Sequence, residues 1–212
     1  MSMPVIVIGG GGHARVLIDA LLASSVTVAG IADPDPSLVS TKILGVPVLG
    51  GDEIISSFPA GEIRLVNGIG SVGVLERRKL LFEKFKNMGY IFSSVIHPTA
   101  VIANTVELGE GVQVMAGAVI QTGSRIGMNS IINTRSSVDH DCIIGDHSHI
   151  APGVTLSGEV TIGKGSHIGT GATLIQGVCI GEMALVGAGS LVLKKVLSGS
   201  TVMGVPARMV KR

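Results

Sequence analysis

Branched apolar residues recur at every sixth position from Ile96 to Val192, without a single shift in phase. A small or short residue follows each of them four positions later, as Cys142 follows Val138. A period of six fits neither the 3.6-residue repeat of an amphipathic helix nor the two-residue alternation of a strand. It is typical of a parallel β-helix, in which each hexad forms one side of a prism and three hexads complete a turn. The pattern therefore predicts such a coil, with the branched residues pointing to its axis.

This repeat also predicts which residues become neighbours in space. Residues separated by three hexads lie on successive turns, whose strands stack about 4.8 Å apart. We therefore expect Gly158 to lie beside His140, and His167 beside His149. Glycine follows the branched residue in several hexads, as at Gly163, and there we expect the backbone to bend sharply.

A different pattern occupies the first part of the chain. Residues 4–8 predict a buried strand, which ends in four glycines, and residues 13–24 have helical spacing. Residues 26–31 predict a second strand, closed by Asp33. A unit of strand, glycine turn, helix and strand places a phosphate at the helix N-terminus and a ribose or base beside the acid.

The next segment completes half of a dinucleotide-binding fold. We expect a turn at residues 45–48, a short helix over 51–58 and a third strand over 62–67, followed by a second glycine turn that contains Gly70. Residues 74–88 predict an amphipathic helix. Its apolar face is expected to consist of Leu75, Leu80, Leu81 and Phe85. A segment of this size suits one nucleotide, and a whole NAD is the alternative.

The predicted organisation is a Rossmann-like α/β domain over residues 1–90, the coil over 91–197 and a C-terminal tail over 198–212. Aromatic residues make up only 2% of the 212 residues, as suits a narrow prism. A net charge of +1 gives no general attraction to nucleic acid or to a membrane. No apolar run approaches the roughly 18 residues of a spanning helix.

We expect a cytoplasmic protein for two reasons. No basic segment precedes the first strand, so a signal peptide is not indicated. Cys142 and Cys179 are the only cysteines, and their separation is not a whole number of turns. They should not stack on each other, and reduced thiols are therefore the simpler interpretation.

An ordered set of short motifs along the whole chain resembles the hexapeptide-repeat sugar acetyltransferases. The matching segments are the glycine turn from Gly9 to Arg15, His97-Pro98, Ile132-Asn133-Thr134, His140-Asp141-Cys142, Ser148-His149 and Gly204-Val205-Pro206-Ala207. This family includes nucleotide-aminosugar N-acetyltransferases and enzymes of the sialic-acid O-acetyltransferase type. The resemblance implies a left-handed β-helix, a homotrimer with active sites between subunits, and acetyl-CoA as donor. It also implies that the N-terminal domain holds a nucleotide-linked sugar, whose 4-amino group is acetylated.

Transfer of acetyl from a thioester needs a base for the attacking amine and donors for the oxyanion that forms. His140 is the best candidate base, because histidine titrates near neutrality and this position lies at a turn of its hexad. The resemblance gives it the same role. It also implies that the N–H of Gly158 binds the oxyanion and that Asp141 orients the imidazole. The family more often has Glu at position 141, so Asp139 is an alternative.

The binding residues form two groups. By the resemblance, acetyl-CoA contacts His149, and the backbones of Thr170 and Ala188 flank its pantetheine arm, while Arg208 in the tail could lie near its 3′-phosphate. The candidate nucleotide-sugar site consists of Gly11, Gly12, His13, Asp33 and Gly70, with Asn133 as the implied contact of the acceptor sugar. We predict no metal site, because the histidines are spread over different faces. His147 is assigned to solvent and His97 to the domain junction.

We therefore predict an acetyl-CoA-dependent N-acetyltransferase of a nucleotide-linked 4-amino-dideoxy sugar. O-acetylation of sialic acid or a related sugar is the first alternative, and it differs in whether the first domain binds a nucleotide. A β-helix that only binds sugar or acts as a scaffold is the second. That alternative predicts no binding of acetyl-CoA.

Overall fold

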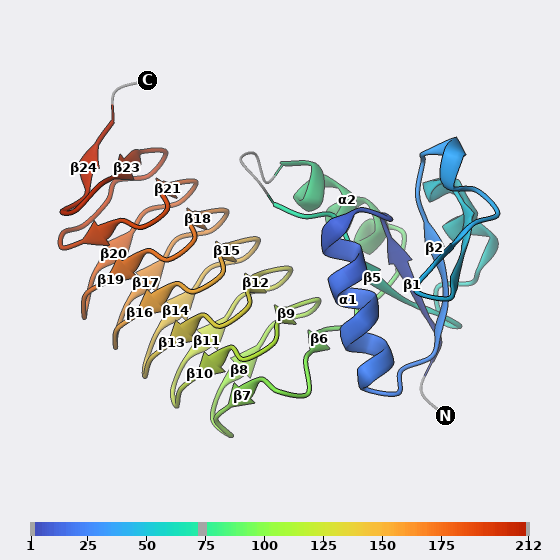
Figure 1. Cartoon of the computed structure of the whole chain (residues 1–212), viewed down its shortest axis with the longest axis horizontal. Coiled ribbons are helices and arrows are strands. Elements are labelled where there is room, and N and C mark those ends of the chain that lie inside the picture. The colour runs from blue at the N-terminus through green and yellow to red at the C-terminus, as the bar shows by residue number, and fades with distance from the viewer. Residues whose placement is uncertain (1–2, 72–75, 211–212) are drawn as a thin grey trace. The chain divides into compact units, whose positions relative to one another are not determined.

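The computed structural model describes residues 3–71 and 76–210. Its contacts divide the chain into two compact units, Met1–Pro98 and Thr99–Arg212. The first is a Rossmann-like α/β unit and the second a parallel β-helix, as predicted (Figure 1). The expected domain boundaries at residues 90 and 197 stay predictions. Within the described residues, no helix is long and apolar enough to cross a bilayer.

One mainly parallel sheet forms the centre of the first unit. Its strands are β1 (Val5–Ile8), β2 (Val28–Ala32), β3 (Lys42–Ile43), β4 (Val46–Gly50) and β5 (Arg64–Asn67). They lie in the order β3-β4-β2-β1-β5. Because β1 pairs in parallel with both β2 and β5, the segments that follow these three strands meet at one edge of the sheet.

The hairpin of β3 and β4 replaces the turn expected at residues 45–48. The turn consists of Leu44 and Gly45, which have φ values of +50° and +82°. Val46 and Val48 are buried and alternate with the exposed Pro47, and β4 also pairs with β2. The proline suggested a turn, but a proline is tolerated at strand positions where no N–H is needed.

The helices of the first unit are α1 (Gly12–Ala23) and α2 (Glu76–Asn87), and its 3₁₀ helices are η1 (Pro36–Leu38) and η2 (Asp52–Ser57). The start of the helix predicted from residue 74, and Leu75 with it, lie outside the described residues. The buried face of α2 consists of Arg78, Leu81, Phe82 and Phe85. Leu80 is 58% exposed, so its assignment to that face was wrong. The buried positions follow the i, i+3, i+4, i+7 spacing, and an arginine occupies the first of them.

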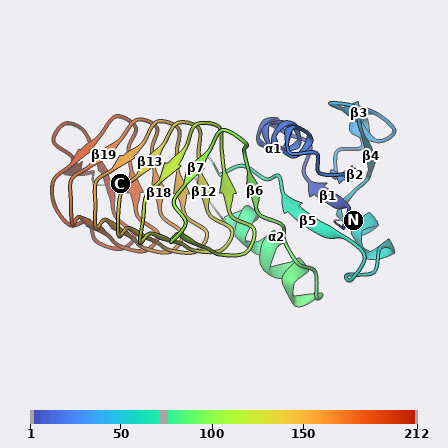
Figure 2. The same cartoon turned by 90° about the horizontal axis from the view of Figure 1, so that it is seen from below.

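Short strands from successive turns pair with one another and form the three flat sides of the coil (Figures 1 and 2). The first sheet contains β7 (Val101–Ile102), β10 (Val119–Ile120), β13 (Ser137–Val138), β16 (Thr155–Leu156), β19 (Thr173–Leu174) and β22 (Leu191–Val192). The second contains β8 (Glu107–Leu108), β11 (Arg125–Ile126), β14 (Ile143–Ile144), β17 (Thr161–Ile162) and β20 (Cys179–Ile180). The third runs from β9 (Gln113–Val114) through β12 (Ile131–Ile132), β15 (His149–Ile150), β18 (His167–Ile168), β21 (Leu185–Val186), β23 (Thr201–Met203) and β24 (Arg208–Met209). The strand β6 (Val95–Ile96) falls at the end of the first unit.

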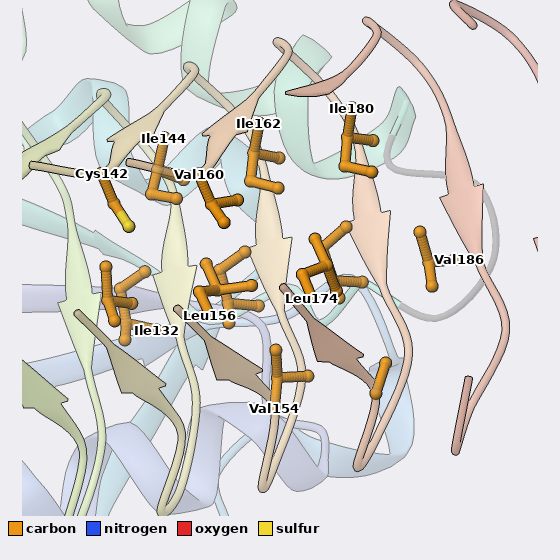
Figure 3. Close-up of a cluster of buried hydrophobic side chains, with 14 of the residues drawn as sticks. Ile132, Cys142, Ile144, Val154, Leu156, Val160, Ile162, Leu174, Ile180 and Val186 are labelled. Atoms are coloured by element: carbon orange, nitrogen blue, oxygen red, sulfur yellow. The ribbon is translucent and has the colours of Figure 1, made fainter. Parts of the chain in front are cut away.

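In the two-residue strands from β9 to β22, the second residue points into the prism. Figure 3 shows Ile144, Ile162 and Ile180 stacked on successive turns of the second sheet, with Cys142 also inside. Burial raises the pKa of the Cys142 thiol to about 11, as befits a small hydrophobic residue. The predicted ladder is buried from Val114 onward.

The first members of the ladder depart from the pattern. Ile96 is 42% exposed, while Ile102 and Leu108 are only partly buried. Within the coil, the first turn is covered by a neighbouring turn on one side only, so its branched side chains are less completely enclosed.

The glycines after the branched residues have a different role from the one expected. None of the described examples, such as Gly145 and Gly163, has a positive φ. They are needed because successive turns approach closely, and a Cβ at Gly163 would lie 2.5 Å from the backbone N of Glu182. The residues with a positive φ lie two positions later in the hexad. Some of these are glycines, such as Gly165, and others are not, such as Asp141 and His147.

We expect Gly163→Ala to lower the free energy of unfolding by about 1–3 kcal/mol, the usual cost of overpacking. The obstacle is backbone, which cannot rotate away as a flexible side chain can. Thermal denaturation measures the effect. Gly61→Ala is the control, because nothing lies within 4 Å of a Cβ at Gly61. Equal stability of the two variants would contradict the close approach of the turns.

Candidate active site

The segments that follow β1, β2 and β5 enclose a cavity of about 630 Å³ in the first unit. Its lining consists of Gly9, Gly11, Gly12, His13, Asp33, Pro34, Asp35, Gly68, Ile69, Gly70 and Arg77. The cavity thus brings together the candidate residues Gly11, Gly12, His13, Asp33 and Gly70. It accounts for every candidate nucleotide-sugar residue of the first unit.

Glycine lets the two turns of this cavity approach each other. A Cβ at Gly68 would lie 2.6 Å from the carbonyl O of Ile8, and one at Gly70 would lie 3.4 Å from Cβ of His13. Helix α1 begins after Gly11 without a side-chain cap and has no acidic residue in its first turn. The first turn of the helix itself therefore adds no carboxylate to the positive end of its dipole, which faces the cavity and favours an anionic group.

Two carboxylates mark another part of the cavity wall. Asp33 accepts hydrogen bonds from the backbone N of Gly10 at 2.6 Å and of Asp35 at 2.8 Å, so it holds the glycine turn as well as lining the cavity. Asp35 accepts from the hydroxyl and the backbone N of Ser37, and these bonds lower the pKa of Asp35. Negative charge here repels phosphate and suits the N–H or O–H donors of a base or ribose.

Two consecutive arginines at the start of α2 were missed by the sequence reasoning. Arg78 is buried, and its Nη1 donates to the carbonyls of Asn67 at 2.9 Å and Ile69 at 2.7 Å. Asn67 Nδ2 donates in return to the carbonyl of Arg78 at 2.9 Å. Burial lowers the pKa of Arg78 to about 9. This network ties α2 to the glycine turn and places the exposed Arg77 on the cavity wall. The sequence did contain a signal for the burial of Arg78, because residue 78 has helical spacing with the buried positions 81, 82 and 85.

His140 lies in the turn between β13 and β14, and a neighbouring carboxylate contacts its ring. The ring Nδ1 is 2.9 Å from Oδ2 of Asp141, whose φ of +58° brings its side chain back toward the histidine. Asp139 instead accepts the backbone N–H of His140 at 2.8 Å. Of the two alternatives, Asp141 is therefore the carboxylate on the imidazole. Its hydrogen bond is the main cause that raises the pKa of His140, and the charge of Asp139 adds to it.

Gly158 lies against the other edge of the same ring. A Cβ at Gly158 would be 2.5 Å from both Cε1 and Nε2 of His140, and the next residue, Glu159, donates its N–H to the carbonyl of His140 at 2.9 Å. The predicted stacking is therefore present. With Nδ1 directed at a carboxylate, Nε2 is the nitrogen that can exchange a proton, beside a position that has no side chain.

A second group lies on the third sheet. His149 pairs with His167 in register, and their rings meet edge to face with centroids 4.8 Å apart. Asn133, directly after β12, places Nδ2 3.0 Å from Nε2 of His149. These side chains form a connected polar cluster on one side of the prism.

The remaining acetyl-CoA candidates lie on the third sheet or directly after its strands. Thr170 and Ala188 are exposed at successive turns of one edge, where the N–H of Gly189 donates to the carbonyl of Thr170 at 2.8 Å. Arg208 is exposed in β24 and donates to the carbonyl of Ala207 at 3.1 Å.

A single chain does not bring the two polar groups of the coil together. His140 lies at the edge that joins the first sheet to the second, whereas His149 lies in the third sheet and Asn133 directly follows a strand of that sheet. His147, assigned to solvent, is instead only 5% exposed, and its Nδ1 lies 3.0 Å from Nδ2 of Asn129. The reason is the register, since position 147 stacks directly on Asn129 of the preceding turn. The described residues include no cluster of three or more His, Cys, Asp or Glu suited to a metal ion.

Comparison with known proteins places both units. Residues 123–158 match the bacterial transferase hexapeptide repeats, and residues 4–85 match the PglD N-terminal domain. A GDP-perosamine N-acetyltransferase of Escherichia coli O157:H7 is 39% identical over 67 residues, which are 32% of this chain and 30% of that relative.

Solved structures match over the full chain. PerB from Caulobacter crescentus, in complex with CoA and GDP-perosamine, is 40% identical with a TM-score of 0.91, and all of each chain is covered. The acetyltransferase domain of PglB from Neisseria gonorrhoeae, in complex with acetyl coenzyme A, is 33% identical with a TM-score of 0.91, covering 99% of this chain and 100% of that one. The chain therefore belongs to the hexapeptide-repeat sugar acetyltransferases, the family of the perosamine and PglB-type enzymes.

Proposed function

We propose that this protein transfers acetyl from acetyl-CoA to the 4-amino group of a nucleotide-linked sugar, and that GDP-perosamine or a close analogue is the acceptor. The observation that carries the proposal is the full-length likeness to the C. crescentus protein in complex with CoA and GDP-perosamine. The cavity of the first unit supports it, since an uncapped helix N-terminus and a carboxylate wall suit the phosphate and the ribose or base of a nucleotide.

In the proposed reaction, the amine nitrogen attacks the carbonyl carbon of the thioester. His140 Nε2 takes the proton of the amine, while Asp141 holds Nδ1 and stabilises the imidazolium that forms. The backbone N–H of Gly158 donates to the oxyanion. When the tetrahedral intermediate collapses, the C–S bond breaks and the CoA thiolate leaves. It can receive the proton that His140 accepted.

A homotrimer is part of the proposal. One prism carries His140 with Gly158 at one edge and Asn133 with His149 on another side. A neighbouring copy could bring the second group opposite the first, and the active sites would then lie between subunits. A cytoplasmic location also remains part of the proposal.

A panel of acceptors tests the proposed function. UDP-, GDP- and dTDP-linked 4-amino sugars, with free sialic acid, are incubated with acetyl-CoA, and CoA release is followed. We expect the GDP-linked amine to react fastest. Preferred turnover of free sialic acid would favour the O-acetyltransferase, and failure to bind acetyl-CoA would favour the scaffold.

Arg77→Ala is expected to raise KM for the nucleotide sugar about tenfold or more, because a hydrogen bond to a charged group contributes about 1.5–3 kcal/mol. Among the described residues that line the cavity, no other is a lysine or an arginine. Arg77 is therefore the expected partner of the diphosphate. KM for acetyl-CoA should stay unchanged in steady-state assays. Lys79→Ala is the control, since Lys79 lies two residues away and pairs with Glu83 at 3.7 Å. Equal effects of both variants would sink the assignment.

The acid limb of the pH–rate profile should depend on Asp141. Its hydrogen bond raises the pKa of His140, so the neutral base becomes abundant only as the pH rises through that elevated pKa. Asp141→Asn lowers the pKa and should move the acid limb of kcat/KM to lower pH, while the maximal rate falls because the imidazolium loses its counter-charge. Asp139→Asn should shift the limb less. A larger shift in Asp139→Asn would assign the orienting role to Asp139.

A further inference from the structure

The side-chain amide of Asn133 has an assigned orientation in the coil. Its Oδ1 lies 2.7 Å from the backbone N of Thr134 and 3.3 Å from the Thr134 hydroxyl. A backbone N–H can only donate, so the atom that faces it must be the amide oxygen. The amide nitrogen of Asn133 therefore occupies the other position, which faces His149.

This orientation determines the protonation of His149. Nδ2 of Asn133 is a donor and lies 3.0 Å from Nε2 of His149. Nε2 must accept this hydrogen bond with its lone pair, so the single proton of the neutral ring is on Nδ1. A proton on Nε2 would point at the N–H of the amide. The contact thus disfavours both the other tautomer and the imidazolium.

The surroundings of His167, on the neighbouring turn, also favour a neutral imidazole ring. His167 packs edge to face against His149, and burial lowers the pKa of His167. Its Nδ1 is buried without a hydrogen-bond partner among the described residues. A charged ring at His149 would therefore lie beside a neutral ring in a site that is largely shielded from water, with 7% of His149 exposed.

We propose that Asn133 is a positioning residue that keeps His149 neutral with its proton on Nδ1, so that this ring meets acetyl-CoA as a hydrogen-bond donor. The inference rests on the proposed function, and it gives Asn133 a role on the donor side of the reaction in place of contact with the acceptor sugar. The two histidines then have complementary roles: His140 accepts a proton, and His149 is held in a state that does not.

Asn133→Asp is the decisive variant. The carboxylate can still accept from Thr134, but it can no longer donate to His149 and would attract a proton to Nε2. In ¹⁵N-histidine NMR spectra of the full-length protein, we expect Nε2 of His149 to be unprotonated in the wild type and protonated in Asn133→Asp. Signals are assigned by their loss in His149→Gln. Asn129→Asp is the matched control, because Asn129 and His147 also make an amide–imidazole contact of 3.0 Å in the coil, yet this change should leave His149 unchanged.

Acetyl-CoA affinity supplies the functional readout. We expect Asn133→Asp to weaken acetyl-CoA binding about tenfold or more by calorimetry, with nucleotide binding unchanged. Calorimetry needs no acceptor, so a failure of the inference is distinct from a failure of N-acetylation. A protonated Nε2 in the wild type overturns the inference, even if Asn133→Asp does not fold. Loss of nucleotide-sugar affinity with intact acetyl-CoA affinity also overturns it, and returns Asn133 to the acceptor.

Discussion

His140→Ala is expected to lower kcat by about 10²-fold or more, the range of 10²–10⁴ that a positioned general base contributes. The imidazole is the ring that Asp141 holds at 2.9 Å and that Gly158 leaves open at Nε2. Its removal should slow the chemical step without affecting substrate binding, so KM values should change little. Single-turnover measurement of acetyl transfer separates these effects.

The control for His140→Ala lies on the same edge of the coil. Gln176 is two turns further along and exposed, and it makes only a long 3.4 Å hydrogen bond to Glu159 among the described side chains. We expect Gln176→Ala to retain most of the turnover. Near wild-type kcat in His140→Ala would remove His140 from the mechanism, and the N-acetyltransferase activity would need another base.

Gly158→Ala should also lower kcat by about 10²-fold, since the added methyl displaces the base that contributes this factor. The new Cβ would lie 2.5 Å from Nε2 and Cε1 of His140, so the ring must swing away. Gly158 has no positive φ, and alanine can adopt its backbone conformation. The loss should therefore appear in turnover and only weakly in stability.

Two readouts separate this steric effect from misfolding. The melting temperature of Gly158→Ala should stay well above that of Gly163→Ala, where backbone is the obstacle. The Nδ1 bond to Asp141 should be lost, so the pKa of His140 falls and the acid limb of the residual activity moves to lower pH. Wild-type turnover in Gly158→Ala would show that the edge facing Gly158 is not where the substrates meet.

The fold was largely predictable because a six-residue period has few structural solutions. Each turn repeats the burial of the same positions, so a single chain displays the rule many times over, from Val114 to Val192. The implied left-handed coil rested on resemblance alone, since the general preference for right-handed crossovers points the other way. Arg78 was missed because a buried charge is unusual, and the hairpin of β3 and β4 was missed because Pro47 resembles a turn residue.

The candidate site was predictable to the extent that the period determines neighbours. It placed Gly158 beside His140 and His167 beside His149, and both contacts are present. The same rule predicts the separation of His140 from His149, because nine residues is half of an 18-residue turn. The repeat alone could not predict the side-chain bonds of Asp141 and Asn133, since each depends on a local turn geometry. The contact of Asp141 with the imidazole was implied only by the resemblance.

The central claim is acetylation of an amine on a nucleotide-linked sugar, and one paired assay tests it most directly. GDP-linked sugars that differ only in bearing a 4-amino or a 4-hydroxyl group are supplied with acetyl-CoA, and the acetylated product is identified by mass spectrometry. We predict rapid acetylation of the amine and none of the hydroxyl. Equal acetylation of the hydroxyl, or no reaction with the amine, would contradict the account.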